Sequence, residues 1–247
     1  MSRYLVLSDL HGNIDALEAA LTAAAHQWDR VLVLGDLVGY GAEPNAVVDR
    51  VRALDPEAVI RGNHDKAACG LDDGSQFNYV ARAAAQWTGE ELSPDNLEYL
   101  RALPPGPLEI DALAEICHGA PFDEDHYIFD PVDAYRALQA MTRPVCLFGH
   151  THLPVIFRAV DGTFEGEAVD PDRDVIVRLQ RGARYLVNVG SVGQPRDGDP
   201  RAAYGILDDE ARELRLFRVP YSVEAAQQRI LAAGLPASLA NRLALGR

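Results

Sequence analysis

The 247-residue chain carries 37 acidic against 23 basic residues and a formal net charge of −14, so its surface opposes nonspecific binding to nucleic acid or anionic membrane. Hydrophobic residues make up 48% and charged residues 24% of the chain, which is typical of a globular domain. No apolar run is long enough to span a bilayer, the N-terminus lacks a signal-peptide layout, and the three widely spaced cysteines fit neither a disulfide framework nor a zinc ribbon. We therefore expect one cytoplasmic domain over residues 1–247.

The first sixty or so residues alternate short apolar runs with helical patterns. The runs at residues 4–7, 30–34 and 57–60 predict strands, and residues 14–21 and 45–54 predict the helices that connect them. Alternating strands and helices indicate βαβ units and hence a parallel sheet. Ligands of such sheets bind beyond the carboxyl ends of the strands, so the residues that follow each strand are candidates for function.

Residues 72–107 have a different character. Residues 77–87 and 94–103 predict two helices, which are followed by the breaker Pro104-Pro105-Gly106-Pro107. We expect a helical insertion within the single domain that lies beside the site and forms a wall of the substrate pocket.

The remainder of the chain returns to strands. Residues 113–117 and 145–148 predict two strands with a helix at 131–141 between them. The dipeptide Asp161-Gly162 marks a hairpin, after which the pattern favours antiparallel pairing. Antiparallel strands are predicted at residues 155–160, 163 onward, 185–189, 203–207 and 213–219. One or two surface helices are predicted from residue 222 onward.

Metal-ligating side chains follow the predicted strands. Residues two apart in an extended chain project from the same face, so Asp9 and His11, after the first strand, can converge on one point. A carboxylate oxygen beside an imidazole nitrogen is a ligand pair for a first-row divalent metal. Four further strand ends supply Asp36, Asn63, His118, His150 and His152. The sequence therefore predicts a metal site at the carboxyl ends of the strands.

These residues stand in five ordered motifs, namely Asp9-x-His11, Gly35-Asp36, Gly62-Asn63-His64-Asp65, His118-Gly119 and Gly149-His150-x-His152. Together the motifs resemble those of the calcineurin-like metallophosphoesterase superfamily. The segment from Asn188 to Arg196 resembles a loop of its small prokaryotic branch, which is YfcE-like and archaeal phosphodiesterase-like. The resemblance implies a four-layer α/β/β/α sandwich with the helical insertion described above.

The resemblance also implies two metal ions with one shared ligand. One ion would be held by Asp9, His11, Asp36 and His152, and the other by Asp36, Asn63, His118 and His150, with Asp36 bridging. Mixed nitrogen and oxygen ligands suit Mn²⁺, iron, Zn²⁺, Co²⁺ or Ni²⁺ better than Mg²⁺. A hydroxide shared between the ions would attack phosphorus.

His64 is assigned by the resemblance as a proton donor to the leaving oxygen, and the ordinary pKa range of histidine suits that task. Its expected partner is Asp65 or Asp9, and the sequence does not choose between them. We therefore treat His64 and Asp65 as candidate catalytic residues, and His64 and Asn63 also as candidate substrate-binding residues.

Three further residues have both a functional and an ordinary interpretation. Arg196 either pairs with a substrate phosphate or forms a salt bridge with Asp197 or Asp199. For His126 a solvated loop is favoured over a role beside the substrate. For Tyr40 a packed loop aromatic is favoured over stacking on a base.

The favoured activity is hydrolysis of a phosphodiester or nucleotide-like small substrate. The Ser/Thr phosphatases of the resembled superfamily carry Asp-Arg-Gly where this chain has Gly39-Tyr40-Gly41, and a Glu where it has Asp65. The alternatives are a phosphomonoesterase or protein phosphatase, a diadenosine-polyphosphate hydrolase and, from another class, a non-catalytic metal-stabilised scaffold that binds a protein. The expected partner is a small phosphorylated substrate, without membrane or stable nucleic-acid binding, and late exposed strands leave room for a homo-oligomer.

Overall fold

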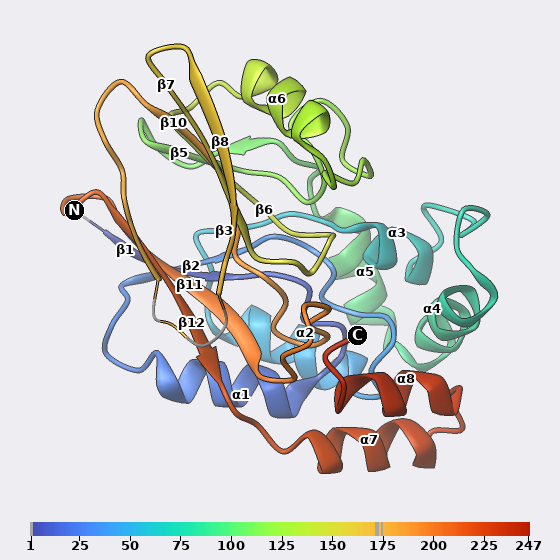
Figure 1. Ribbon diagram of the computed structural model, residues 1–247. Coiled ribbons are helices and arrows are strands. Elements are labelled where there is room, and N and C mark those ends of the chain that lie inside the picture. The colour runs from blue at the N-terminus through green and yellow to red at the C-terminus, as the bar shows by residue number, and fades with distance from the viewer. Residues whose placement is uncertain (1, 171–172, 174) are drawn as a thin grey trace.

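The computed structural model describes residues 2–170, 173 and 175–247 and arranges them in four layers (Figure 1). One six-stranded sheet has the order β3 (Ala58–Val59), β2 (Arg30–Val33), β1 (Arg3–Leu7), β11 (Ala202–Asp208), β12 (Glu213–Val219) and β9 (Val175–Arg178). The other has the order β4 (Leu108–Glu109), β5 (Ala114–Ile116), β6 (Val145–Phe148), β10 (Arg184–Asn188), β7 (Val155–Val160) and β8 (Thr163–Ala168). The sheets pack face to face, which confirms the predicted sandwich.

Eight helices surround the two sheets in the described part of the chain. They are α1 (Ile14–Ala23), α2 (Pro44–Ala53), α3 (Asn63–Ala68), α4 (Tyr79–Glu91), α5 (Pro94–Ala102), α6 (Pro131–Ala140), α7 (Val223–Ala232) and α8 (Ala237–Leu243). In Figure 1, α1 and α2 lie below the first sheet and α6 lies above the second. None of the helices in the described ranges combines the length and the apolar character that crossing a bilayer requires.

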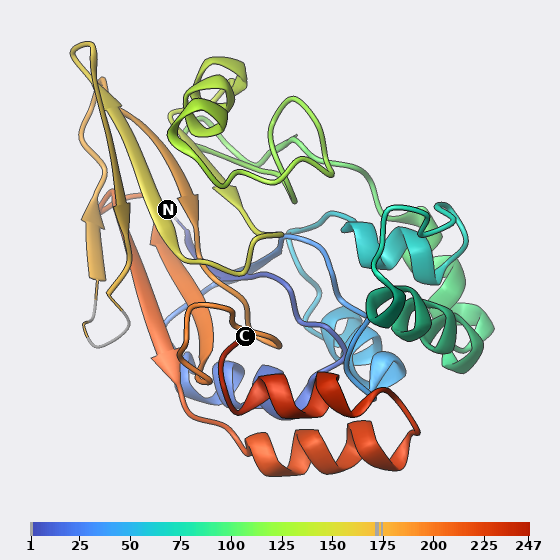
Figure 2. The same cartoon turned by 45° about the vertical axis from the view of Figure 1, so that its right-hand side comes forward.

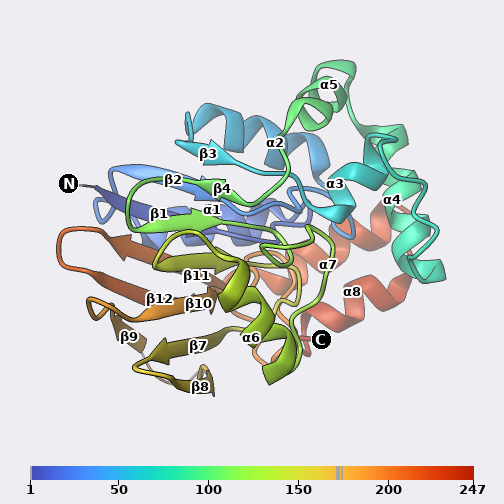
Figure 3. The same ribbon diagram turned by 90° about the horizontal axis from the view of Figure 1, so that it is seen from above.

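Each sheet contains a parallel core. β3, β2 and β1 are parallel, as are β5, β6 and β10, whereas the strands added beyond them pair in antiparallel fashion. Figure 3 shows α3, α4, α7 and α8 gathered beyond one end of the strands, opposite the N-terminus. This is the end at which β1 finishes, so the polar strand-end residues predicted above lie under these helices.

The sequence of β1 is apolar on both faces of the strand because each face packs into a core. Leu5 and Leu7 pack into the core between the first sheet and its helices, while Tyr4 and Val6 pack into the core between the two sheets. Successive side chains of a strand point to opposite faces, so a strand covered on both sides is apolar throughout.

The structure corrects the sequence predictions at three elements and at the C-terminus. The motif Gly62-Asn63-His64-Asp65, for which no helix was predicted, begins the short helix α3, and β4 and β9 were not predicted because they are very short or lie at a sheet edge. The C-terminal helices are not simply surface elements. Leu235, Leu239 and Leu243 are buried in a cluster with Tyr40 and residues of α4. Figure 2 shows α7 and α8, in red, next to the dark green helix α4.

Candidate metal centre

The strand-end turns of this chain adopt an unusual backbone conformation. Non-glycine residues rarely have positive φ because Cβ clashes with the backbone, and such strain collects at functional sites. Ten described non-glycine residues have positive φ. Five of these belong to the predicted motifs, namely Asp9, His11, Asp36, His150 and His152, and a sixth, Tyr40, lies four residues after Asp36. The backbone thus turns each of these side chains away from the direction that a continuing strand would give it.

The first group of candidate ligands is contributed by the turns after β1, β2 and β6. The ligating atoms of Asp9, His11, Asp36 and His152 all lie within 4.8 Å of one another, and all four residues are buried. His11 Nε2 is 3.0 Å from His152 Nε2, and His152 Nε2 is 3.3 Å from Asp9 Oδ1. His11 Nε2 is 3.6 Å from Asp36 Oδ2.

The second group shares Asp36 with the first. Asp36 Oδ2 is 3.3 Å from His118 Nε2, which is 3.1 Å from His150 Nδ1. Asn63 Oδ1 is 3.2 Å from the same His118 nitrogen. All seven predicted ligands therefore converge on one location, and Asp36 is the carboxylate common to both groups.

Main-chain carbonyls determine which nitrogen of each histidine faces the cluster. A carbonyl only accepts hydrogen bonds, so the ring nitrogen that contacts it carries the proton. The four pairs are His11 Nδ1 with Val38 O, His118 Nδ1 with Leu34 O, His152 Nδ1 with Gln194 O, and His150 Nε2 with Asp125 O. The other nitrogen of each ring points at the cluster, as metal ligation requires, and the donor set fits divalent metal ions.

The electrostatics of the cluster favour a bound cation. Burial disfavours the charge on His118, yet the Asp36 carboxylate outweighs it and raises the pKa of His118 to about 10. Although burial opposes it, this positive charge holds the pKa of Asp36 well below its usual range. Burial, reinforced by the His118 charge, lowers the pKa of His150 to about 3. Without metal, the buried carboxylate thus draws a proton onto one histidine, in the place where a cation would bind.

Residues 3–212 match the domain described as the calcineurin-like phosphoesterase superfamily domain. The chain belongs to this superfamily. It is 39% identical to a metallophosphoesterase from Sphaerobacter thermophilus of known crystal structure, with a TM-score of 0.89 over 100% of this chain and 99% of the other. It is 33% identical to an uncharacterized protein from Methanocaldococcus jannaschii, covering 100% of this chain and 99% of that protein. A hypothetical protein from Pyrococcus horikoshii, 21% identical over 100% and 99% of the two chains with a TM-score of 0.77, shares the fold.

His64 lies beside the candidate ligand cluster, with its ring centroid 5.0 Å from that of His11, and lacks the partner expected for it. Asp65 accepts hydrogen bonds from the main-chain N–H of Val38 and of Gly62, at 3.1 and 2.9 Å, and Asp9 is bonded elsewhere. His64 Nδ1 is buried with no partner among the described residues. The predicted pairing is therefore wrong, because Asp65 caps α3 instead.

Burial also changes the proton affinity of His64. It lowers the pKa of the ring to about 4, so the ring is neutral near pH 7 instead of titrating in the ordinary histidine range. The imidazole is held between aromatic rings, with its centroid 4.3 Å from that of Tyr40 and 4.5 Å from that of Phe77. Phe77 precedes α4, so the region expected to be a helical insertion contributes a side chain beside the site.

Sequence reasoning missed the residues that hold the loop between β5 and α6 against α3. Lys66 Nζ pairs with Glu124 Oε1 at 3.1 Å and with Asp125 Oδ2 at 2.6 Å. Arg61 binds Glu124 through two hydrogen bonds. Since Asp125 O accepts a hydrogen bond from His150 Nε2, these ion pairs position a candidate ligand. The only available signal was the run of acidic residues at 123–125, which reads as a solvated loop.

The three residues with two interpretations, Arg196, His126 and Tyr40, have different surroundings in the structure. The salt bridge of Arg196 with Asp197 or Asp199, one of its two interpretations, is absent among the described residues, because those carboxylates bind Arg218 and Arg201. His126 is hydrogen-bonded to Asp133 and does not join the cluster. Tyr40 is a packed loop aromatic, as favoured, but it packs within the site, with its ring centroid 4.8 Å from that of His11.

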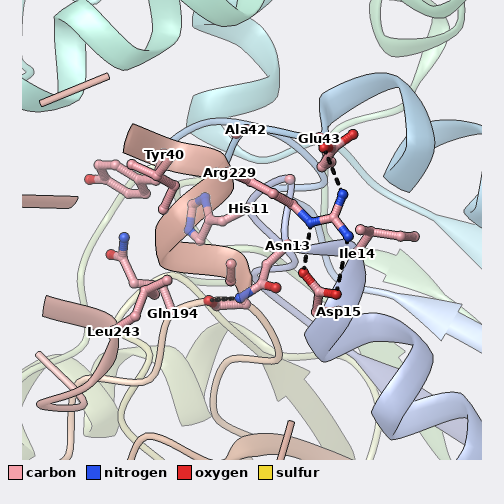
Figure 4. A pocket seen from close by; sticks show the side chains of 15 residues that line it. His11, Asn13, Ile14, Asp15, Tyr40, Ala42, Glu43, Gln194, Arg229 and Leu243 are labelled. Carbon is pink, nitrogen blue, oxygen red and sulfur yellow. Dashed lines mark hydrogen bonds and ion pairs between the residues drawn. The ribbon is translucent and has the colours of Figure 1, made fainter. Parts of the chain in front are cut away.

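A pocket beside His11 lies between the strand-end turns and helix α7 (Figure 4). Tyr40 and His11 form one side, and Arg229 of α7 crosses the other. The Arg229 guanidinium is neutralised by Asp15 and Glu43, each at 3.1 Å. The C-terminal helices are thereby anchored to the turns that carry the candidate ligands.

Proposed function

We propose that this chain is a dinuclear metal-dependent phosphoesterase that hydrolyses phosphodiester or nucleotide-like small substrates. The observation that carries the proposal is the convergence of two buried ligand groups on one shared carboxylate, Asp36. Two cations a few ångströms apart repel each other, and a bridging carboxylate offsets that repulsion.

The site residues divide the work of catalysis among them. Bound divalent ions would polarise the phosphoryl oxygens and lower the pKa of bound water, which is the chemistry that the site needs from them. Asp9, His11 and His152 would hold one ion together with Asp36, and Asn63, His118 and His150 would hold the other together with the same Asp36, so that a bound phosphate would be oriented by both groups of ligands. The ring of His64 reaches the leaving oxygen, and because it is neutral it donates through its N–H.

A small diester is favoured over a phosphoprotein because of the turn at Gly39-Tyr40-Gly41. Where the protein phosphatases of the superfamily carry an arginine, this chain has Tyr40, whose ring is buried against His11 and His64. The aromatic side chain provides no charged clamp for a phosphomonoester, which carries one more negative charge than a diester.

The test compares hydrolysis of bis-p-nitrophenyl phosphate and p-nitrophenyl phosphate, with added Mn²⁺ and after metal is stripped. We expect faster, Mn²⁺-dependent cleavage of the diester. Asp36→Asn should lose metal at both positions, by metal analysis, together with activity, whereas Asp161→Asn at an exposed hairpin turn should keep both. Faster hydrolysis of the monoester would contradict the proposed substrate class. If neither ester is hydrolysed while metal is bound, the proposal that the protein is a phosphoesterase is wrong.

A further inference from the structure

Three rings form a stack that begins at the candidate ligand His150 and leads to the surface of the molecule. The Tyr127 ring covers the imidazole of His150, with the ring centroids 3.6 Å apart and the planes inclined by 23°. Phe129 stacks on Tyr127 with the centroids 5.1 Å apart and the planes within 5° of parallel. Because His150 occupies one face of the Tyr127 ring, Phe129 lies on the other face. We call Tyr127 and Phe129 the aromatic platform.

The aromatic platform is open to solvent. Tyr127 is 38% exposed and Phe129 is 64% exposed, although Phe129 is already covered by Tyr127 on one side. Of the nine large apolar side chains that are exposed in the described part of the chain, four lie close together in sequence, namely Tyr127, Phe129, Val132 and Tyr135. Exposed apolar side chains that are scattered singly are ordinary, whereas a group of them beside a candidate metal centre indicates a binding surface.

The loop that carries the two rings is tied to the core of the second sheet. Ile128, which separates them, is buried in a cluster with residues of α6 and β6. Residues two apart in an extended chain project to the same side, so burial of Ile128 directs Tyr127 and Phe129 outward together. The next residue, Asp130, caps α6 by accepting hydrogen bonds from two main-chain N–H groups of that helix at 2.8 and 2.9 Å. Rings held in this way lose little conformational freedom when a ligand stacks on them.

The chemistry of the aromatic platform favours one nucleobase as its occupant. Every base has a flat π-face that stacks on an exposed aromatic ring, whatever its pattern of hydrogen-bonding groups. The outer ring is phenylalanine, which offers no polar atom, so it separates flat groups from aliphatic ones and does not distinguish one base from another. The net charge of −14 opposes the binding of a long polyanion, so a single nucleoside is favoured over a nucleic-acid strand.

The aromatic platform and the proposed proton donor are next to different groups of candidate ligands. The His64 ring lies 5.0 Å from that of His11, which belongs to the first group. The stack begins at His150, which belongs to the second group. This separation favours placing the base on the part of the substrate that stays on phosphorus, away from the leaving oxygen.

We infer that Tyr127 and Phe129 form a stacking subsite for a nucleobase carried by the part of the substrate that stays bonded to phosphorus. The substrate is then a diester of a single nucleoside monophosphate. The inference rests on the proposed function and narrows its substrate class.

The test compares two diesters with the same charge and the same leaving group, thymidine 5′-(p-nitrophenyl phosphate) and methyl p-nitrophenyl phosphate. In the Mn²⁺-loaded parent protein we expect kcat/KM to be at least about fivefold higher for the nucleoside ester, since one base stacked on an aromatic ring contributes at least that much. Phe129→Ala removes the outer ring and should reduce this ratio to within about twofold, whereas Phe129→Trp should retain it. Calorimetry with thymidine 5′-monophosphate and methyl phosphate, which does not depend on turnover, should show the same pattern in binding.

Tyr135→Ala is the matched control, because it removes another exposed ring of the same surface, one that packs edge-on against Phe164 and not on the stack. It should keep the full ratio. Equal kcat/KM for the two esters in the parent protein, an undiminished ratio in Phe129→Ala, or an equal loss in Tyr135→Ala would overturn the subsite.

The two assays separate the subsite from the proposed function. If both esters are hydrolysed without a preference for the nucleoside, the proposed function survives and the subsite is wrong. If neither ester is hydrolysed but thymidine 5′-monophosphate binds with the expected preference, the aromatic platform binds a base and the proposed function is wrong. Absence of both hydrolysis and preferential binding would reject both.

Discussion

The two oxygens of the Asp36 carboxylate face different partners. Oδ1 accepts a hydrogen bond from the main-chain N–H of His64 at 2.8 Å, and Oδ2 faces the nitrogens of His11 and His118. The main-chain N–H of His64, in the first turn of α3, thus orients the Asp36 carboxylate, and the His64 ring takes no part in this contact. Backbone and side chain of the same residue serve separate purposes, which allows the side chain to be tested alone.

Replacing His64 with Ala should keep both metal ions, because the N–H that holds Asp36 remains. Loss of the proton donor should lower kcat/KM by about 10²–10⁴-fold for esters with poor leaving groups and much less for p-nitrophenolate. Rates measured over aryl phosphodiesters of increasing leaving-group pKa should therefore fall more steeply in His64→Ala. Parallel slopes for parent and variant would contradict the donor role.

The same variant gives a pH prediction. Burial lowers the pKa of His64 to about 4, so the ring keeps one protonation state between pH 6 and 8. The ratio of parent to variant kcat/KM should therefore be flat over that range. A donor with the ordinary histidine pKa would instead lose its proton as pH rises, and the ratio would fall through about pH 6.5.

Among the secondary-structure elements, the contact between α3 and the turn after β2 leaves no space for side chains. A Cβ added to Gly62 would lie 2.1 Å from Asp36 Oδ1 and 2.4 Å from the Asp36 main-chain nitrogen. Gly62 has a φ of −104°, which any residue can adopt, so glycine is needed here for space and not for conformation. The start of α3 and the bridging carboxylate therefore form one rigid unit.

Gly62→Ala should displace Asp36 and reduce metal content at both positions while the fold is retained. Metal analysis of the purified protein, with circular dichroism to verify folding, measures this. Gly182→Ala is the control, because no atom lies within 4 Å of the added Cβ and its positive φ costs only about 1–2 kcal/mol. Full metal content in Gly62→Ala would show that the turn adapts and that the unit is not rigid.

On the scale of the molecule, the order of motifs along the chain allowed both the fold and the ligand cluster to be predicted. Strand-end placement works because parallel strands end at the same edge, so Asp9 and Asp36 had to meet. What could not be predicted depends on contacts between distant segments. The packing of Tyr40 under α8 and the capping by Asp65 follow from how the helices dock, which no local pattern encodes. The roles assigned to the ligands and to His64 remain predictions.

The candidate ligands also join the two sheets, because Asp9, His11 and Asp36 follow strands of the first and His118, His150 and His152 follow β5 and β6 of the second. Metal binding should therefore stabilise the whole sandwich. At a free concentration one hundred times the Kd, each ion adds about 2.7 kcal/mol, and stripping both should lower Tm by about 10 °C or more.

The metal-free protein should lose further stability on acidification. Burial lowers the pKa of four histidines, His11, His64, His150 and His152, below their unfolded value near 6.5. Below pH 6.5 the unfolded chain binds protons that the folded chain does not, so stability falls as pH decreases. Two groups oppose this trend: burial, reinforced by Asp36, raises the pKa of Asp65 to about 7, and the Asp36 carboxylate, against burial, raises the pKa of His118 to about 10, so the four histidines outweigh them. Melting curves of chelator-treated protein should thus show Tm rising from pH 5 to 6.5, and a Tm that falls over this range would contradict the burial of these four rings in the neutral form.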